Sequence, residues 1–227
     1  MTSTSVNMGS GQDMGNEGGS DSQRKRLLGD LYSLIDQAPK NGIDTPPSLD
    51  EKIQETCQQL QALSPNPRPC EENVELLDGF WYMLWTNYAP AGPSSGKLGP
   101  FVGNVYQELR MLSTASDSSI ARNIFRLGFP PIMGELQASP RIHDERTVAI
   151  AFERVGTKVA GVLPLGPNIN FEPGKEVRLW EHVYVDEKHR ILYASNAADP
   201  TDPAEPNPIY LYVMKRADSD QFSTDIF

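Results

Sequence analysis

The feature that most constrains this chain is a series of short segments, beginning after Asp78, in which apolar residues recur at every second position. Such alternation is typical of β-strands that bury one face. Turn residues separate the segments, and almost no helical periodicity interrupts them. About eight or nine strands are therefore predicted, at 80–87, 105–112, 119–127, a weaker 134–138, 147–155, 158–163, 177–185, 190–195 and 209–216.

The order of these strands favours an antiparallel barrel or sandwich, because no crossover helices lie between them. Residues 147–155 alternate most cleanly, and a tight connection at Val155-Gly156-Thr157 is expected to pair them with 158–163. A barrel of about eight strands is just wide enough to hold one small ligand. Strand order alone leaves the barrel and the sandwich open.

Two amphipathic helices are expected before the strands. Ser22 can cap the first helix, whose apolar residues run from Leu27 to Ile35 at the spacing of one helical face. The second is expected to start at Ser48, where Glu51 three residues later completes a capping box. Prolines at 65, 67 and 69 forbid its continuation. The predicted fold class is therefore mainly β, with a helical region in front.

The chain is expected to divide into a polar lead-in (1–21), a helical region (22–75), a β-barrel (76–217) and an acidic tail (218–227). The lead-in has no apolar core of a secretory signal, and its three acidic residues are unlike a transit peptide. We expect it to be disordered. No stretch approaches the roughly 20 apolar residues that span a bilayer, so any membrane contact is expected to be peripheral.

The formal net charge of −10 disfavours a nucleic-acid partner, because an acidic surface repels phosphate. It also disfavours electrostatic adhesion to anionic lipid, since the short run Arg24-Lys25-Arg26 is too small for that role. Cys57 and Cys70 could pair, but two cysteines are not the framework of a secreted protein. We expect two reduced thiols.

The sequence carries no pattern typical of an enzyme. It has no Gly-x-Ser-x-Gly nucleophile turn, and residues 92–97 resemble a phosphate-binding loop only superficially. His143, His182 and His189 show no spacing that indicates a metal site. We therefore expect no catalytic residues, no metal and no cofactor.

Aromatic residues concentrate in the first predicted strand. Trp81 and Trp85 are four residues apart and are expected to share a face of the sheet. These rings either line a ligand cavity or simply fill a small barrel.

Polar residues within the late strands offer a second set of candidates. Arg190 needs a partner if it faces inward. It could form a polar pair with Asp186 that orients a ligand head group, with Tyr184 and Tyr193 beside it; alternatively, Asp186 is a turn residue and Arg190 lies on the surface. Asn123 either satisfies a backbone group or binds ligand, and the structural role is favoured.

Several segments, in order, resemble the plastid lipid-associated protein or fibrillin family. Residues 76–86, LLDGFWYMLWT, resemble its opening strand, L-(D/N)-G-x-W-x-L-x-(Y/W)-T. Further upstream, 28–35, the loop at 42–43 and 60–67 are similar to its N-terminal helices and their L-N-P exit. Downstream similarities lie at 98–107 (G-P-x-x-x-x-V-x-Q), 122–124 (x-N-(V/I)), 148–153 (V-x-V-x-F-E), 184–191 (Y-x-D-(E/D)-x-x-R-I) and the last strand at 210–215. The chain departs after residue 191, where the family often continues S-R-G-x-x-G.

This resemblance implies a lipocalin-like antiparallel β-barrel preceded by two N-terminal helices, in a plastid at plastoglobules, thylakoids or the stroma. It implies a non-enzymatic protein that binds or organises apolar lipids or isoprenoids such as carotenoids and quinones, with peripheral membrane or lipid-droplet contact and no nucleic acid. The alternative is a scaffold with a filled barrel that recruits protein partners such as prenyl-lipid enzymes or coats lipid droplets; an enzyme of prenyl-lipid metabolism is the third reading. The candidate ligand-binding residues are Trp81, Trp85, Phe125, Ile150, Phe152, Tyr184, Arg190 and Tyr193.

Overall fold

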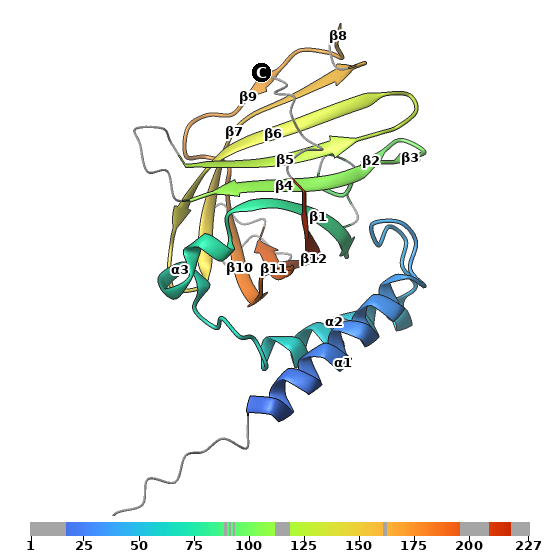
Figure 1. Ribbon diagram of the computed structural model, residues 1–227. Helices are drawn as coiled ribbons and strands as arrows, with labels where there is room; N and C mark the ends of the chain where they lie inside the picture. Colours follow the sequence, from blue (N-terminus) through green and yellow to red (C-terminus); the bar gives the residue numbers. More distant parts are fainter. Residues whose placement is uncertain are drawn as a thin grey trace, which may run out of the picture.

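The computed structural model describes residues 17–88, 90, 92, 94–111, 119–160, 163–195 and 209–218. Most of the expected lead-in, the Pro- and Asp-rich segment 197–208 and nearly all of the expected acidic tail lie outside these residues. In the described part the chain is mainly β, and its helices precede the strands (Figure 1).

The N-terminal helices form where the periodicity predicts them, but their starts differ. α1 (Glu17–Ile35) begins before Ser22, which therefore lies inside the helix and does not cap it. α2 (Pro47–Gln61) begins one residue before Ser48, and no side chain caps it. Proline at the first helical position already has the φ angle that a helix requires, so the expected capping box is replaced by Pro47. α3 (Pro69–Glu72) and the 3-10 turn η1 (Val74–Leu76) follow.

The strands form one closed circuit of antiparallel pairings. Along the sheet the order is β10-β11-β12-β1-β4-β5-β6-β7, and β7 also pairs with β10, which makes a ring of eight strands within the described residues. The strands of the ring are β1 (Gly79–Thr86), β4 (Asn104–Arg110), β5 (Ile120–Arg126), β6 (Ile132–Ile142), β7 (Thr147–Val159), β10 (Val177–Val185), β11 (His189–Ser195) and β12 (Ile209–Ala217). Short strands flank it: β2 (Lys97–Leu98), β3 (Phe101–Val102), β8 (Leu163–Pro164) and β9 (Ile169–Asn170).

The hairpin expected at Val155-Gly156-Thr157 is wrong. β7 runs straight through Gly156, which pairs with Glu135 on β6. β6 is long enough to pair with all of β7, so the glycine is held in a continuous ladder and no turn forms there. Ala160, with φ of 53°, follows the end of β7 and takes the left-handed conformation that a turn needs.

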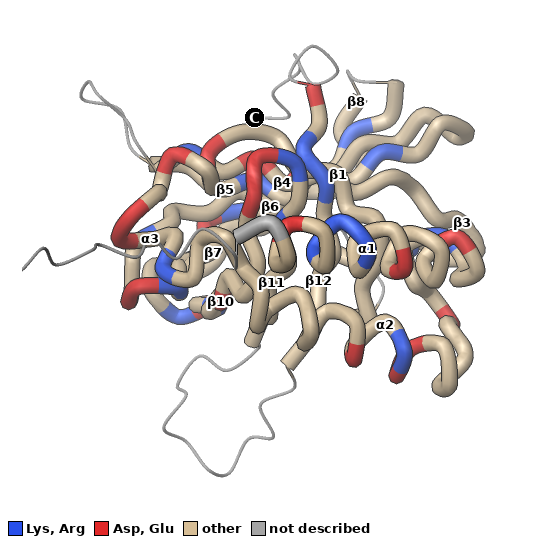
Figure 2. Tube along the Cα trace, turned by 60° about the horizontal axis from the view of Figure 1, so that its bottom comes forward, with Lys and Arg blue, Asp and Glu red and all other residues tan. Residues whose placement is uncertain are grey.

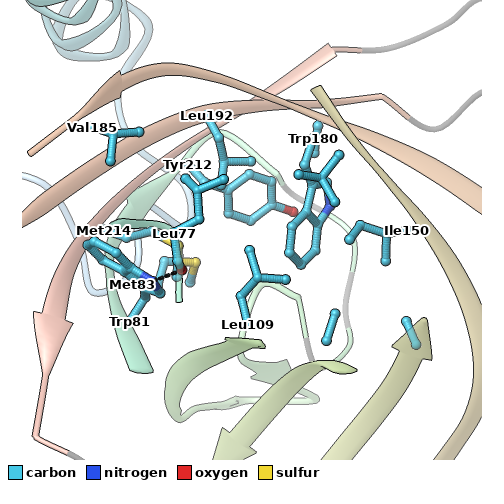
Figure 3. Close-up of a cluster of buried hydrophobic side chains, with 14 of the residues drawn as sticks. Leu77, Trp81, Met83, Leu109, Ile150, Trp180, Val185, Leu192, Tyr212 and Met214 are labelled. Atoms are coloured by element: carbon cyan, nitrogen blue, oxygen red, sulfur yellow. Dashed lines mark hydrogen bonds between the residues drawn. The ribbon is translucent and has the colours of Figure 1, made fainter. Parts of the chain in front are cut away.

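The interior of the ring is packed with apolar side chains at the end that α3 covers (Figure 3). Trp81 and Leu109 are fully buried there, and the Trp81 indole donates a hydrogen bond to the Leu77 carbonyl at 3.0 Å. Cys70 of α3 packs against the same residues. The other packed residues that Figure 3 labels are Met83, Ile150, Trp180, Val185, Leu192, Tyr212 and Met214. This end of the ring is therefore a solid core.

A second core lies outside the ring, where α1 and α2 pack against it (Figure 1). Leu31 and Leu60 of the helices meet Ile191 and Val213 of β11 and β12. Positive and negative residues both occur along the two helices (Figure 2), and Arg24 forms an ion pair with Asp21. None of the described helices has the length and apolar character to cross a membrane. Cys57 lies in this outer core and Cys70 in the inner one, and both are free thiols, as expected.

Three register shifts occur in the described ladders of the ring, one of them between β6 and β7, and those on β1 and β10 decide which side of the ring two aromatic side chains face. β1 shifts register between Met83 and Trp85, so Trp81 points into the ring while Trp85 points outward beneath the helices. The expectation that these two tryptophans share a face is therefore wrong, because the extra residue at Leu84 reverses the alternation. β10 has a similar shift between His182 and Tyr184.

Candidate functional site

A half-enclosed cavity of about 280 Å³ lies inside the ring, at the end opposite α3. It begins where the packed core stops, beyond the C-terminal end of β1 and the N-terminal end of β12. Six aromatic side chains line it: Tyr88, Phe152, Phe171, Trp180, Tyr210 and Tyr212. Six strands of the ring, β4, β5, β6, β7, β10 and β11, supply most of the remaining wall, and Gly92, Ser94 and Glu176 complete it. A cavity of this kind suits a small or slender apolar ligand whose remainder extends into solvent or lipid.

The aromatic residues support one another around the cavity. Tyr88 meets Tyr210 edge-on with 4.6 Å between ring centroids, and Phe152 lies 6.2 Å from Phe171. Arg178 lies over the Phe152 ring at 5.7 Å and contacts Glu176 at 3.4 Å. The cavity therefore has aromatic side walls, with one charged pair among its lining residues.

The inner wall of the cavity is polar. Gln107 of β4 and Asn123 of β5 sit directly opposite each other in the strand register, and both line the cavity. Both side chains are buried. Asn123 Nδ2 lies 3.5 Å from Ser94 Oγ, and its Oδ1 has no hydrogen-bond partner among the described residues.

Arg190 lies behind this wall, in the packed half of the ring. Its guanidinium donates to Gln107 Oε1, contacts Met214 Sδ at 3.1 Å and lies over the Trp81 ring at 4.7 Å. Burial, together with nearby Arg216, lowers the pKa of Arg190 to about 9, which still leaves it charged at neutral pH. No ion pair joins it to a carboxylate within the described parts of the chain.

His182 is the other buried titratable group of the interior. It is fully enclosed, and neither ring nitrogen has a hydrogen-bond partner in the described structure. Burial, and secondarily the charge of Arg190, hold the pKa of His182 well below its ordinary value. It is therefore neutral at physiological pH.

The structure separates the eight predicted site residues into three groups. Phe152 lines the cavity. Trp81, Ile150 and Arg190 point into the ring but lie in its packed part, and Phe125 is buried on β5 against Gly103 and Gly134. Trp85, Tyr184 and Tyr193 belong to the outer core beneath the helices and do not line the cavity.

Asp186 does not pair with Arg190. It lies in the turn between β10 and β11, where it accepts hydrogen bonds from the backbone N–H groups of Lys188 and His189. Burial pushes the pKa of Asp186 upward, but hydrogen bonds from His189, Lys188 and Tyr184 outweigh it and lower the pKa to about 2. The prediction that Asp186 is a turn residue is confirmed. The alternative that Arg190 lies on the surface is wrong, because Arg190 is completely buried.

Several lining residues were missed from the sequence, and the reasons differ. Trp180 and Tyr212 lie in predicted strands at inward positions, so their alternation could have identified them. Phe171 lies in a loop, where alternation gives no signal. Gln107 can be recognised as a candidate site residue only when the β4–β5 register, which places it opposite Asn123, is known. Within the described residues no group of three histidine, cysteine or acidic side chains could hold a metal ion.

The family model described as PAP_fibrillin matches residues 25–194, which is most of the chain. No curated protein sequence matches it.

Proposed function

Since the chain belongs to the PAP/fibrillin family, we propose that it is a non-enzymatic plastid protein whose ring of strands is a lipocalin-like barrel that holds an apolar lipid or isoprenoid. Carotenoids and quinones are the ligand classes that the family resemblance suggests. Plastoglobules or thylakoids are the proposed setting. The family assignment supports the plastid and lipid context, and the cavity supports the binding role.

The single observation that carries this proposal is the half-hollow interior. One end of the ring is filled by side chains, but the other encloses about 280 Å³ between aromatic walls. Burying about 150 Å² of apolar ligand surface there contributes about 4 kcal/mol at roughly 25 cal/mol per Å². That is enough to hold the end of a lipid, while a longer chain gains more from contacts outside the cavity.

Exposed apolar residues beside the cavity support contact with a lipid surface. Leu163, Leu165 and Ile169 are 64%, 49% and 57% exposed, and they lie on and between β8 and β9. Ile169 pairs with Val155, which lines the cavity. Phe129, 87% exposed, lies in the neighbouring β5–β6 turn. A lipid surface that met these side chains would lie next to the proposed binding site.

The test is a titration of the protein with decylbenzoquinone, followed by tryptophan fluorescence. Trp180 lines the cavity, so a bound quinone should quench its emission. Ala194→Phe places a ring in the cavity and should weaken binding by at least about tenfold, because the ligand loses its space. Ala151→Phe is the matched control, since Ala151 adjoins Phe152 and faces the outside of the ring.

Equal quenching in both variants would contradict a site inside the ring. Absence of quenching in the wild-type protein, together with capture of a defined prenyl-lipid enzyme, would favour the scaffold alternative. Circular dichroism should confirm that both variants keep their strand content.

A further inference from the structure

We propose that the inner wall of the cavity selects a lipid whose buried head group is a neutral hydroxyl, and in particular a phenol. This inference rests on the proposed lipid-binding function and specifies the ligand class of that same site. It follows from Gln107 and Asn123, which both line the cavity, and from the hydrogen-bonding capacity that their side chains leave unused in the described structure.

Gln107 supplies a hydrogen-bond donor whose orientation is fixed. An arginine guanidinium carries only donors, so the Gln107 group that meets Arg190 must be its oxygen, Oε1. The amide NH₂ of Gln107 is then directed away from Arg190. Because Gln107 lines the cavity and Arg190 does not, this NH₂ is the group available to a ligand.

Asn123 supplies an acceptor. Its Nδ2 is oriented toward Ser94 Oγ at 3.5 Å, and its Oδ1 is buried without a hydrogen-bond partner among the described residues. The residue is only 5% exposed, so this oxygen has lost bulk water and has gained no protein donor. A buried unpaired acceptor is costly, and a ligand that donates to it recovers that cost.

A hydroxyl is the neutral group that matches both residues at once. It accepts one hydrogen bond from Gln107 and donates one to Asn123, which lies directly across the strand pair. A quinone carbonyl or an ether can accept from Gln107 but leaves the Asn123 oxygen unpaired. A carboxylate also only accepts, and its full negative charge would face the partially negative amide oxygen of Asn123.

The walls next to this pair favour a ring as the carrier of the hydroxyl. Trp180 and Tyr212 line the same cavity as Gln107 and Asn123. The aromatic side chains of these two residues can pack against the ring of a ligand in a stacked or edge-on arrangement. A prenylated phenol or hydroquinone therefore fits the described groups better than the corresponding quinone.

The experiment compares 4-octylphenol with its methyl ether, 4-octylanisole, by isothermal titration calorimetry on the full chain. The two probes share ring and tail and differ only in the hydroxyl hydrogen. We expect the wild-type protein to bind the phenol about tenfold more tightly, the usual effect of one buried polar group left unpaired. Asn123→Leu should reduce this preference to less than about threefold while anisole binding persists. Asn104→Leu, on the outward face of β4, is the matched control and should keep the preference.

Each outcome has a separate meaning. Equal binding of both probes to the wild-type protein would overturn the hydroxyl inference and leave the lipid-binding proposal standing. Binding of neither probe would overturn both. A preference that survives in Asn123→Leu would overturn the role given to its oxygen. The wild-type comparison needs no variant, so it decides the inference even if Asn123→Leu does not fold.

Discussion

Replacing Arg190 with methionine should change the free energy of unfolding by less than about 2 kcal/mol, although the side chain is completely buried. Removing one partner of a buried ion pair usually costs 3–5 kcal/mol, but Arg190 has no carboxylate partner within the described residues. Its contacts are the Gln107 oxygen, the Met214 sulfur and the face of Trp81. The prediction depends on how these contacts compare with the cost of burying the charge.

The magnitudes nearly cancel. Burial, with a contribution from Arg216, lowers the pKa of Arg190 from 12.5 to about 9, which corresponds to a cost on the order of 5 kcal/mol for keeping the charge inside. The cation–π contact with Trp81 offsets about 2 kcal/mol of this. A hydrogen bond from a charged donor to Gln107 offsets roughly 1.5–3 kcal/mol. Methionine fills much of the same volume without a charge, so little net stability is lost.

The assay is guanidinium chloride unfolding at pH 7, followed by circular dichroism and tryptophan fluorescence. Leu192→Ala is the control, because Leu192 is also fully buried on the inner face of β11. That variant should lose about 2–5 kcal/mol through the cavity it creates. A loss above about 3 kcal/mol in Arg190→Met, similar to the control, would refute the reasoning and show that the guanidinium is a net source of stability.

Three further predictions concern titration and backbone strain. Burial keeps His182 neutral in the folded protein, whereas in the unfolded chain it is protonated below about pH 6.5. The free energy of unfolding of the wild type should therefore fall by up to about 1.4 kcal/mol per pH unit below that value. His182→Leu should show a shallower fall, measured from unfolding midpoints at pH 7, 6 and 5. The pKa of Asp186 is lowered to about 2, so its stabilising effect is present above the unfolded pKa near 4 and is lost as pH falls from 4 to 2. Asp186→Asn should lower the free energy of unfolding by about 2 kcal/mol at pH 7. It should also flatten this part of the acid-unfolding curve measured by circular dichroism. Gly42 has φ of +80°, and a Cβ there would lie 2.3 Å from the Thr86 carbonyl oxygen. Gly42→Ala should therefore lower the free energy of unfolding by at least about 2 kcal/mol, measured by thermal denaturation. An unchanged melting temperature would contradict this close approach.

The mainly β architecture could be predicted from the sequence because alternation is a local signal. The bulges on β1 and β10 could not. Their extra residues, Leu84 and Val183, are ordinary apolar strand residues, so the sequence does not mark where the inward face changes. The prediction therefore placed Trp85 and Tyr184 on the wrong face. Tyr193 is different, because simple alternation already puts it opposite Arg190.

The polar part of the candidate site could not be assembled from one sequence. Asn123 was noticed as a polar residue in a strand, but its relation to Gln107 depends on the β4–β5 register. The sequence between β4 and β5 contains no recognisable turn motif that would fix this register. The contact between Arg190 and Gln107 joins residues 83 positions apart, through the interior of the ring. Such a contact can be identified only from the three-dimensional arrangement of the closed ring of strands.

The division of the interior into a packed half and a hollow half separates stability from binding. Trp81 and Leu109 are completely buried near α3, and the outer core under α1 and α2 adds a second apolar layer. Phe152, Phe171 and Tyr210 line the cavity and are only partly buried, so changing them should affect ligand preference more than folding. Arg190 connects the two halves, since it sits within the packed end but fixes the Gln107 amide that faces the cavity. If the proposed function holds, the role of this buried charge is to keep the Gln107 donor directed at the ligand, and its small net effect on stability is consistent with that role.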